Sequence, residues 1–282
     1  MKNNQYLKIK GAVLDNEQLG TYMEKLALDH LLTTSSSLKT YPIPRLKENL
    51  QFIEKTYSLL NEHADKKIDI YPAGEWLLDN FYIIEETVKT VIKELTPKKY
   101  KNLMGIEGSG YSRIYAIGAE IISHTDGIIN EHNINQAIVR YQKRKTLSME
   151  EIWNLWLFLD IAIIENIRNI CEKIYLAQMQ KYKVENILER LIGNEQAKTV
   201  KFPIKDNNVG VGASTTRKQT SHQEMKYSFI EYMSYRLKQY GRRAVPYLRI
   251  LEDQVSKMGM DISEVIQKEH FDIAVRKSFF RK

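Results

Sequence analysis

The sequence predicts an all-α protein, a multi-helix array or bundle of about eight to ten helices with one long irregular loop. Residues that favour helices, chiefly Leu, Ile, Glu and Lys, are abundant among the 282 positions, whereas Gly (13) and Pro (6) are few. Apolar residues recur every three or four positions, and no segment ahead of the loop shows the alternating pattern of a half-buried strand.

The first three helices are bounded by local signals. Asp15 and Gln18 have the spacing of a capping box, which predicts a helix start. The polar segment 33–44 contains two prolines near its end, and a second helix with an apolar stripe is expected directly after it. The third helix is expected to stop before Pro97. The expected helices span about 15–32, 45–63, 73–95, 111–125, 134–143, 149 to beyond 178 with continuation to 191, 224–240, 242–258, and 262 to the end.

The longest and most apolar helix follows Ser148, which forms a second capping box with Glu151. Its apolar run from residue 152 to 164 is interrupted by Asn154 and Asp160. This run is well short of the roughly 20 residues that a membrane span needs, so we expect a buried core helix.

A change of composition divides the chain. Residues 1–193 are expected to form the main helical domain, and 194–223, rich in Gly, Ser, Thr and Asn, a loop or linker with a short extended piece at 199–205. Residues 224–282 are expected to form C-terminal helices that pack on the main domain. Helical periodicity continues to the last residue without a stop signal, so we expect a piece of a longer protein.

Charge and cysteine content restrict the class of protein. The net charge of +7 suits a nucleic acid, an anionic membrane surface or an acidic partner, but the basic residues are spread out, which favours a mildly basic solvated surface. The single cysteine, Cys171, excludes an internal disulfide and is expected to be a small buried apolar group.

The stretch 75-EWLLDNFYIIEE-86 concentrates acids and aromatic residues. On a helix, Glu75, Asp79 and Glu86 lie opposite the apolar stripe that includes Leu77 and Ile84. Such a face is typical of a solvated helix. The alternative is a catalytic carboxyl pair, as in glycoside hydrolases, which requires a cleft and one acid with a raised pKa. The sequence favours solvation.

Arg113, Glu120 and His124 are expected to project close together from the helix at 111–125. Glu120 and His124 have the spacing for a local hydrogen bond. His124 beside Asp126 raises the alternative of a metal site, but no second histidine stands at ligand spacing. We therefore expect a structural polar network.

Asp160 falls at the centre of an apolar helix stripe that includes Trp153 and Trp156. A carboxylate there needs a partner or a raised pKa. We expect a partner on another helix, with Arg113, His124 and Arg168 as the leading candidates. Glu165 and Arg168 have the spacing for a local ion pair.

Four segments together resemble the N-terminal region of the cyclic β-1,2-glucan synthases, large bacterial proteins often assigned to glycosyltransferase family 36 and described as cellobiose-phosphorylase-like. These are 75-EWLLDNFYIIEE-86, 111-YSRIYAIGAEIISHTDG-127, 141-YQKRKTLSMEEIWNLWLFLDIAIIENIR-168 and 262-ISEVIQKEHFDIAVRKS-278. The resemblance extends from about residue 14 to the end, apart from the loop near 195–222.

The resemblance implies a non-catalytic scaffold or interaction segment of a UDP-glucose-dependent hexosyltransferase. The parent protein is expected to be the enzyme, because the D-x-D and Q-x-x-R-W motifs of processive transferases are absent from this sequence. The alternatives left open are a free-standing carbohydrate-active enzyme with paired carboxylates and a basic helical nucleic-acid binder.

The same resemblance sets the expected partners and place in the cell. The expected partners are the downstream catalytic modules, with β-glucan and a membrane surface as further candidates; nucleic acid and cofactors are not expected. The expected location is the cytoplasm, with the inner face of the cell membrane, reached through the parent protein, as a further candidate. The candidate contact or polar-network residues are Glu75, Asp79, Tyr82, Arg113, Glu120, His124, Asp126, Asp160, Glu165 and Arg168.

Overall fold

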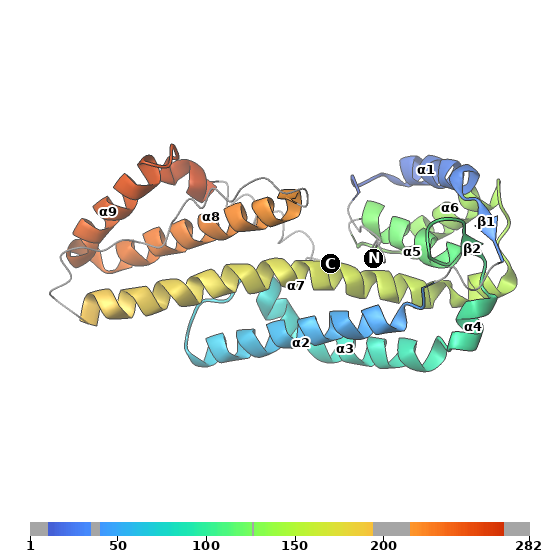
Figure 1. Ribbon diagram of the computed structural model, residues 1–282, viewed down its shortest axis with the longest axis horizontal. Helices are drawn as coiled ribbons and strands as arrows, with labels where there is room; N and C mark the ends of the chain where they lie inside the picture. Colours follow the sequence, from blue (N-terminus) through green and yellow to red (C-terminus); the bar gives the residue numbers. More distant parts are fainter. Residues whose placement is uncertain (1–10, 35–39, 126, 194–214, 268–282) are drawn as a thin grey trace. The chain divides into compact units, whose positions relative to one another are not determined.

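The computed structural model describes residues 11–34, 40–125, 127–193 and 215–267 (Figure 1). The all-α prediction is confirmed. The elements are α1 (Asn16–Asp29), β1 (Leu32–Thr33), α2 (Ile43–Asp65), α3 (Pro72–Glu94), α4 (Pro97–Asn102), β2 (Gly105–Ile106), α5 (Arg113–His124), α6 (Glu131–Gln142), α7 (Met149–Gly193), α8 (Thr215–Gln239), η2 (Gly241–Ala244) and α9 (Val245–Ser256). A further helical turn covers 262–267.

Two compact units divide the chain. The first comprises Met1–Tyr57 and Asp79–Cys171, and the second comprises Ser58–Leu78 and Glu172–Lys282. The boundaries fall inside α2, α3 and α7, so these helices each contribute residues to both units. The division expected from composition, with boundaries at 193 and 223, stays a prediction.

Helix α5 lies at the centre of the first unit. Nearly all of its side chains are buried, including Ile114, Ile117 and Ile121. Gly118 permits a close approach to α7, because a Cβ atom at this position would lie 3.2 Å from the backbone of Phe158. Helix α1 packs against α6 (Figure 1), and β1 pairs antiparallel with β2. The unit is thus built around one almost fully buried helix.

The second unit has its own apolar core. The C-terminal turns of α7 supply Val184 and Leu188, and α8 and α9 supply residues such as Ile230, Met233 and Leu251. These side chains are almost completely buried. The burial of aliphatic side chains is the main favourable term in the folding of this unit.

Lys181 is an unusual buried cation in the second unit. Its Nζ donates to the carbonyl oxygen of Asp69 at 2.9 Å and lies 3.8 Å from the centre of the Tyr71 ring. Gln178 donates to the same Asp69 oxygen, also at 2.9 Å. Burial lowers the pKa of Lys181 from 10.5 to about 8.

Several boundaries differ from those expected. Residues 215–223 were predicted as loop but belong to α8, so the predicted loop end was wrong. This stretch has no apolar residue and therefore no visible helical period. Helix α6 begins three residues before the expected start, because Asn130 and Asn133 form a reciprocal capping box. Helix α4 and the β1–β2 pair were not predicted, and the extended piece expected at 199–205 lies outside the described residues.

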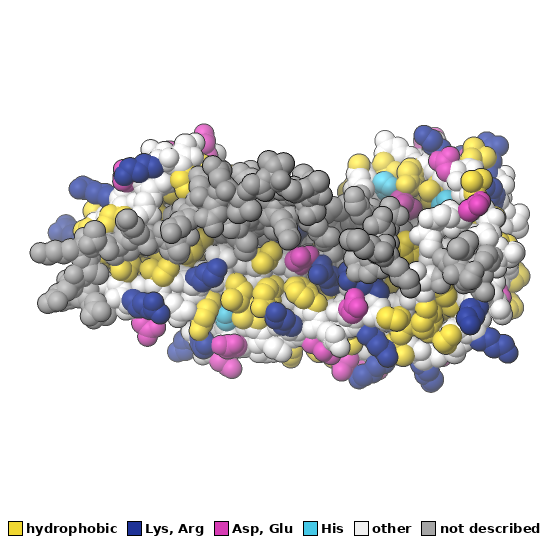
Figure 2. Space-filling model, in the orientation of Figure 1, with side chains coloured by type: hydrophobic (Ala, Val, Ile, Leu, Met, Phe, Trp, Pro, Cys, Tyr) yellow, Lys and Arg dark blue, Asp and Glu magenta, His cyan; other side chains and the backbone are white. Residues whose placement is uncertain are grey.

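Within the described part of the chain, no helix is both long and apolar enough to cross a membrane. Figure 2 shows Lys and Arg side chains interspersed with Asp and Glu over the visible face. Cys171 is buried, as predicted, and burial raises the pKa of its thiol to about 12.

Candidate functional site

The acids of α3 lie on its solvent side, as predicted. Glu75, Asp79 and Glu86 are exposed, whereas Leu77 and Ile84 are buried. Tyr82 is also exposed, at 66 % of its maximal surface. Lys89 reaches back to Glu86 at 3.3 Å, an ordinary helical surface pair. The three acids are thus exposed on a solvated helix face, which does not suit a catalytic carboxyl pair across a cleft.

Glu120 and His124 are brought together, and Tyr22 of α1 joins them. Tyr22 Oη donates to Glu120 Oε2 at 2.7 Å, and His124 Nε2 lies 3.4 Å from the same oxygen. The rings of Tyr22 and His124 are 4.4 Å apart between centroids. Burial and the bond to Glu120 both raise the pKa of Tyr22, so this hydroxyl is a donor at neutral pH.

The cluster Tyr22–Glu120–His124 also holds the segment ahead of α1. His124 Nδ1 is 2.8 Å from the carbonyl oxygen of Ala12, and Leu14 N donates to the His124 carbonyl oxygen at 2.9 Å. A Cβ atom on Gly11 would lie 2.5 Å from the His124 ring. Glu120 and His124 therefore lie together, in contact with Tyr22 and with the segment ahead of α1; a structural role for them stays a prediction.

Nothing in the described residues supports a metal site. No group of three or more His, Cys, Asp or Glu side chains there could hold a metal ion. Asp126, the proposed companion of His124, lies outside the described residues.

Arg113 takes no part in the Tyr22–Glu120–His124 cluster, contrary to the prediction. It forms a buried two-point ion pair with Glu151 of α7, with Nε 2.8 Å from Oε1 and Nη2 against Oε2. Glu151 also accepts from the backbone N and the hydroxyl of Ser148, at 2.9 and 3.0 Å. The predicted capping box is therefore present, and its acid has a second role that its position in the sequence did not reveal.

A buried histidine lies near this ion pair. His30 Nδ1 is 2.8 Å from Tyr141 Oη, and Lys145 Nζ donates to the His30 carbonyl oxygen. Burial first, and then the charges of Lys145 and Arg113, lower the pKa of His30 to about 4. His30 is therefore neutral at physiological pH, and sequence reasoning did not single it out.

Glu165 is paired with α2 and not with Arg168, so that prediction was wrong. Arg45 Nη2 donates to Glu165 Oε1 at 2.8 Å, and Asn49 Nδ2 donates to Glu165 Oε2. The guanidinium of Arg168 instead lies 4.8 Å from the centre of the Phe52 ring. The reason is tertiary: α2 offers Glu165 two donors that a helical wheel of α7 does not show.

Asp160 has no hydrogen-bond or ion-pair partner among the described residues. The expected partners are engaged elsewhere, Arg113 with Glu151, His124 with Ala12, and Arg168 over Phe52. Burial raises the pKa of Asp160 from 3.8 to about 6. The prediction that Asp160 has a basic partner was therefore wrong. The alternative, a raised pKa of its carboxyl group, is found instead.

The surroundings of Asp160 also differ from those expected. Leu157, Ile164 and Cys171 are buried as predicted, but Trp153 and Trp156 are 68 % and 46 % exposed. These two indoles were assigned to the core because the sequence period places them on the same stripe. They lie on the solvent-facing margin of that stripe instead.

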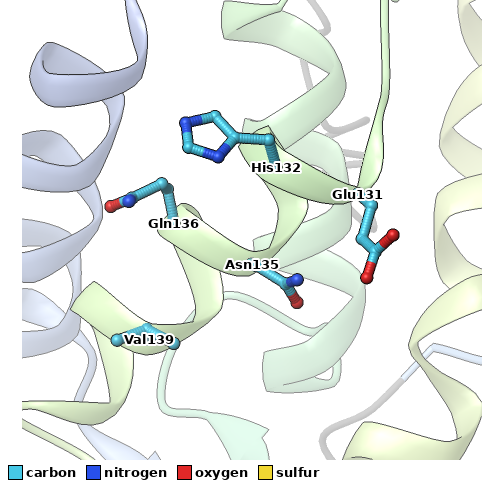
Figure 3. A pocket seen from close by; sticks show the side chains of 5 residues that line it. All are labelled: Glu131, His132, Asn135, Gln136 and Val139. Atoms are coloured by element: carbon cyan, nitrogen blue, oxygen red, sulfur yellow. The ribbon is translucent and has the colours of Figure 1, made fainter.

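A shallow hollow of about 420 Å³ lies on α6. It is lined by Glu131, His132, Asn135, Gln136 and Val139, which all project from this one helix (Figure 3). No residue predicted from the sequence lines it. The hollow has one acid and no second carboxyl group facing it, so it does not provide a hydrolase site.

Comparison with known proteins gives a distant relationship. No family model matches the chain. The cyclic β-(1,2)-glucan synthase NdvB of Rhizobium meliloti (strain 1021) is 22% identical over 227 residues, which is 80% of this chain and 8% of that protein. The chain thus spans a small fraction of the relative's length. The match confirms the resemblance to cyclic glucan synthases: this chain is distantly related to a protein that synthesises a glucan.

Proposed function

We propose that this chain is a non-catalytic scaffold or interaction segment of a large bacterial glycosyltransferase similar to the cyclic β-1,2-glucan synthases. The observation that carries the proposal is the match to NdvB, which covers 80% of this chain but only 8% of the relative. Most of the relative's length therefore lies outside the similarity. In the proposal, glucosyl transfer belongs to such further modules.

The state of the carboxyl groups supports a non-catalytic role. The two buried acids of the first unit, Glu151 and Glu165, are each held by an arginine and by further donors. Burial alone raises the pKa of Asp160, without a contribution from a second carboxylate. An acid and base pair across a cleft, as glycoside hydrolysis requires, is not formed among the described residues.

The exposed side of α3 is the proposed docking surface for the catalytic modules. In the first unit it presents Asp79 and Glu86 together with Tyr82 and Ile83, which are 66 % and 47 % exposed. Glu75, one turn earlier on the same helix, belongs to the second unit. Exposed aromatic residues such as Tyr82 are enriched in protein interfaces relative to the rest of a protein surface. We assign the same role that the resemblance implied for Glu75, Asp79 and Tyr82.

The end of α8, the connection through η2 and the start of α9 form the proposed contact with an anionic membrane surface. Residues 232–251 contain no Asp or Glu, and Lys238, Arg242, Arg243 and Arg249 are all exposed. None of these four cations forms an ion pair with a described residue. Exposed Tyr240 and Val245 lie between them in the chain. Basic residues with interspersed aromatic and aliphatic groups suit a headgroup region.

An activity assay on the isolated chain tests the central part of this proposal. The chain, incubated with UDP-glucose or with linear β-1,2-glucans, is expected to show neither glucosyl transfer nor hydrolysis. Turnover that is abolished by Glu75→Gln or Asp79→Asn would establish the alternative, a free-standing enzyme with paired carboxylates. A Glu131→Gln variant, which changes an acid of the α6 hollow, is the matched control.

A further inference from the structure

One face of α7 is exposed where the helix begins. Met149, Trp153 and Trp156 are 59 %, 68 % and 46 % exposed, and half-buried Asp160 follows one turn later. Spacings of four, three and four residues place these side chains on one side of the helix. We call Met149, Trp153, Trp156 and Asp160 the tryptophan face.

We propose that the tryptophan face binds a neutral glucan chain, with glucose rings stacked on Trp153 and Trp156 and a sugar hydroxyl donating to Asp160. The identity of the sugar as glucan rests on the proposed function. The site itself rests on the side chains of α7.

The two indoles provide the stacking surface. An exposed indole combines a large apolar face with a polar N–H, and the C–H groups of a pyranose ring form an apolar face of similar size. Trp153 and Trp156 are three residues apart, which corresponds to a rise of about 4.5 Å along the helix. This rise is comparable with the length of one sugar ring, so neighbouring units of a chain can reach both indoles.

Asp160 supplies the polar contact. It has no donor among the described residues, and burial has already removed part of its hydration shell. A sugar hydroxyl can donate to this carboxyl group while the adjacent ring stacks. A purely apolar protein helix laid over the same face would leave Asp160 without a donor, which is unfavourable. The chemistry therefore favours a polyol over an apolar protein surface.

The charges along this part of α7 disfavour an anionic ligand. Residues 149–160 include Glu150, Glu151 and Asp160 but no Lys or Arg. Among the described residues, the cation that pairs with Glu151 is Arg113, and this arginine is buried in the ion pair. A phosphorylated sugar or a nucleotide sugar would meet unbalanced negative charge. The expected ligand is a neutral oligosaccharide.

Intrinsic fluorescence tests the proposal because the chain has only three tryptophans. In a Trp76→Phe variant, the remaining two belong to the tryptophan face. Titration of this variant and of the wild-type chain with linear β-1,2-gluco-oligosaccharides is expected to give a saturable change in emission, with a matching heat in calorimetry. UDP-glucose is expected to give no saturable change.

Point variants assign the binding to this face. Trp153→Ala and Trp156→Ala are each expected to weaken binding at least fivefold, and the double variant to abolish the heat. Tyr235→Ala, which removes a comparably exposed aromatic residue from α8, is the matched control and is expected to bind as wild type. Both indoles are exposed, so circular dichroism is expected to show folded variants. No saturable signal with the wild-type chain, or unchanged binding by the double variant, overturns the proposal.

Experiments on the complete polypeptide distinguish a failure of this inference from a failure of the proposed function. If oligosaccharides do not bind but the two tryptophan substitutions reduce glucan synthesis by the complete polypeptide, the face docks a protein module; the inference fails and the proposed function stands. If oligosaccharides bind at the tryptophan face but removal of the segment leaves synthesis unchanged, the inference stands and the proposed function fails.

Discussion

Arg113 and Glu151 form a buried two-point ion pair that joins the first turn of α5 to the first turn of α7. Both side chains are almost completely buried, and Glu151 also completes the capping box with Ser148. The first unit therefore depends on one carboxylate for both a helix start and a tertiary contact.

Glu151→Gln is expected to destabilise the chain strongly, because it leaves the Arg113 guanidinium buried without a counter-charge. Loss of one partner of a buried ion pair typically costs about 3–5 kcal/mol. Urea unfolding followed by circular dichroism measures the change. Glu150→Gln, one position earlier on α7, is the control and is expected to change stability by less than about 0.5 kcal/mol. Equal stability of the two variants would contradict the structural role of the pair.

Asp160→Asn is expected to stabilise the chain at pH 7. The pKa of this carboxyl group rises from 3.8 to about 6 on folding, so the folded state prefers the protonated form. The favourable contribution of the protonated carboxyl group to folding stability is complete below pH 3.8 and is lost as the pH rises through 6. At pH 7 the half-buried carboxylate is therefore charged and unfavourable. The gain is expected to be about 1–2 kcal/mol, because water still reaches this half-buried group.

The pH dependence of unfolding provides the check on Asp160. The stability difference between Asp160→Asn and wild type is expected to grow between pH 4 and pH 6.5 and to level off above it. A loss of stability on substitution at pH 7 would instead indicate a favourable partner for the carboxylate, as the sequence had suggested.

Lys181 is expected to make the chain more stable as pH rises from about 8 towards 10.5. Its pKa falls from 10.5 in the unfolded chain to about 8 in the fold, so the folded state binds fewer protons across this window. The slope reaches at most about 1.4 kcal/mol for each pH unit. Unfolding by urea at pH 8 and pH 9.5 tests this, because Lys181→Met is expected to lack the rise.

Lys183→Met is the matched control for Lys181, since it removes an exposed lysine from the same turn of α7. It is expected to keep the wild-type rise between pH 8 and pH 9.5. A rise that persists in Lys181→Met, or disappears in Lys183→Met, would show that another group is responsible.

Binding to anionic vesicles tests the proposed membrane contact. The wild-type chain is expected to co-sediment with vesicles that contain phosphatidylserine or phosphatidylglycerol, and to dissociate as salt is added. Arg242→Gln with Arg243→Gln is expected to reduce the bound fraction several-fold. The control is the double variant Lys47→Gln with Lys98→Gln, which removes two exposed cations elsewhere and lowers the net charge by the same amount. The same loss in both double variants would indicate a general charge effect and no specific contact.

Local patterns predicted most of the helices. The capping boxes at Asp15 and Ser148 and the stripe of α3 rest on neighbours in sequence, and the structure has them. The start of α8 was missed because its first residues are polar, so helical periodicity could not reveal them. The backbone of this polar stretch continues into later turns of α8, whose apolar side chains form part of the core of the second unit.

Contacts between distant helices could not be read from the sequence. Glu165 has the spacing to pair with Arg168, but Arg45 and Asn49 are 120 and 116 residues away in sequence and bind it instead. Similarly, the helical period put Trp153 and Trp156 into the core stripe, although a wheel cannot tell which edge of a wide stripe remains uncovered. The tryptophan face became visible only in three dimensions.

Glucan synthesis by the complete polypeptide tests the central claim most directly. Membranes or purified protein from the complete reading frame, supplied with UDP-glucose, are to be compared with a version that lacks residues 11–267 and with the isolated chain. We expect synthesis by the complete polypeptide, none by the isolated chain, and a reduced yield or altered product size without the segment. Synthesis or hydrolysis by the isolated chain, or an unchanged product without the segment, would contradict the proposal of a non-catalytic interaction segment.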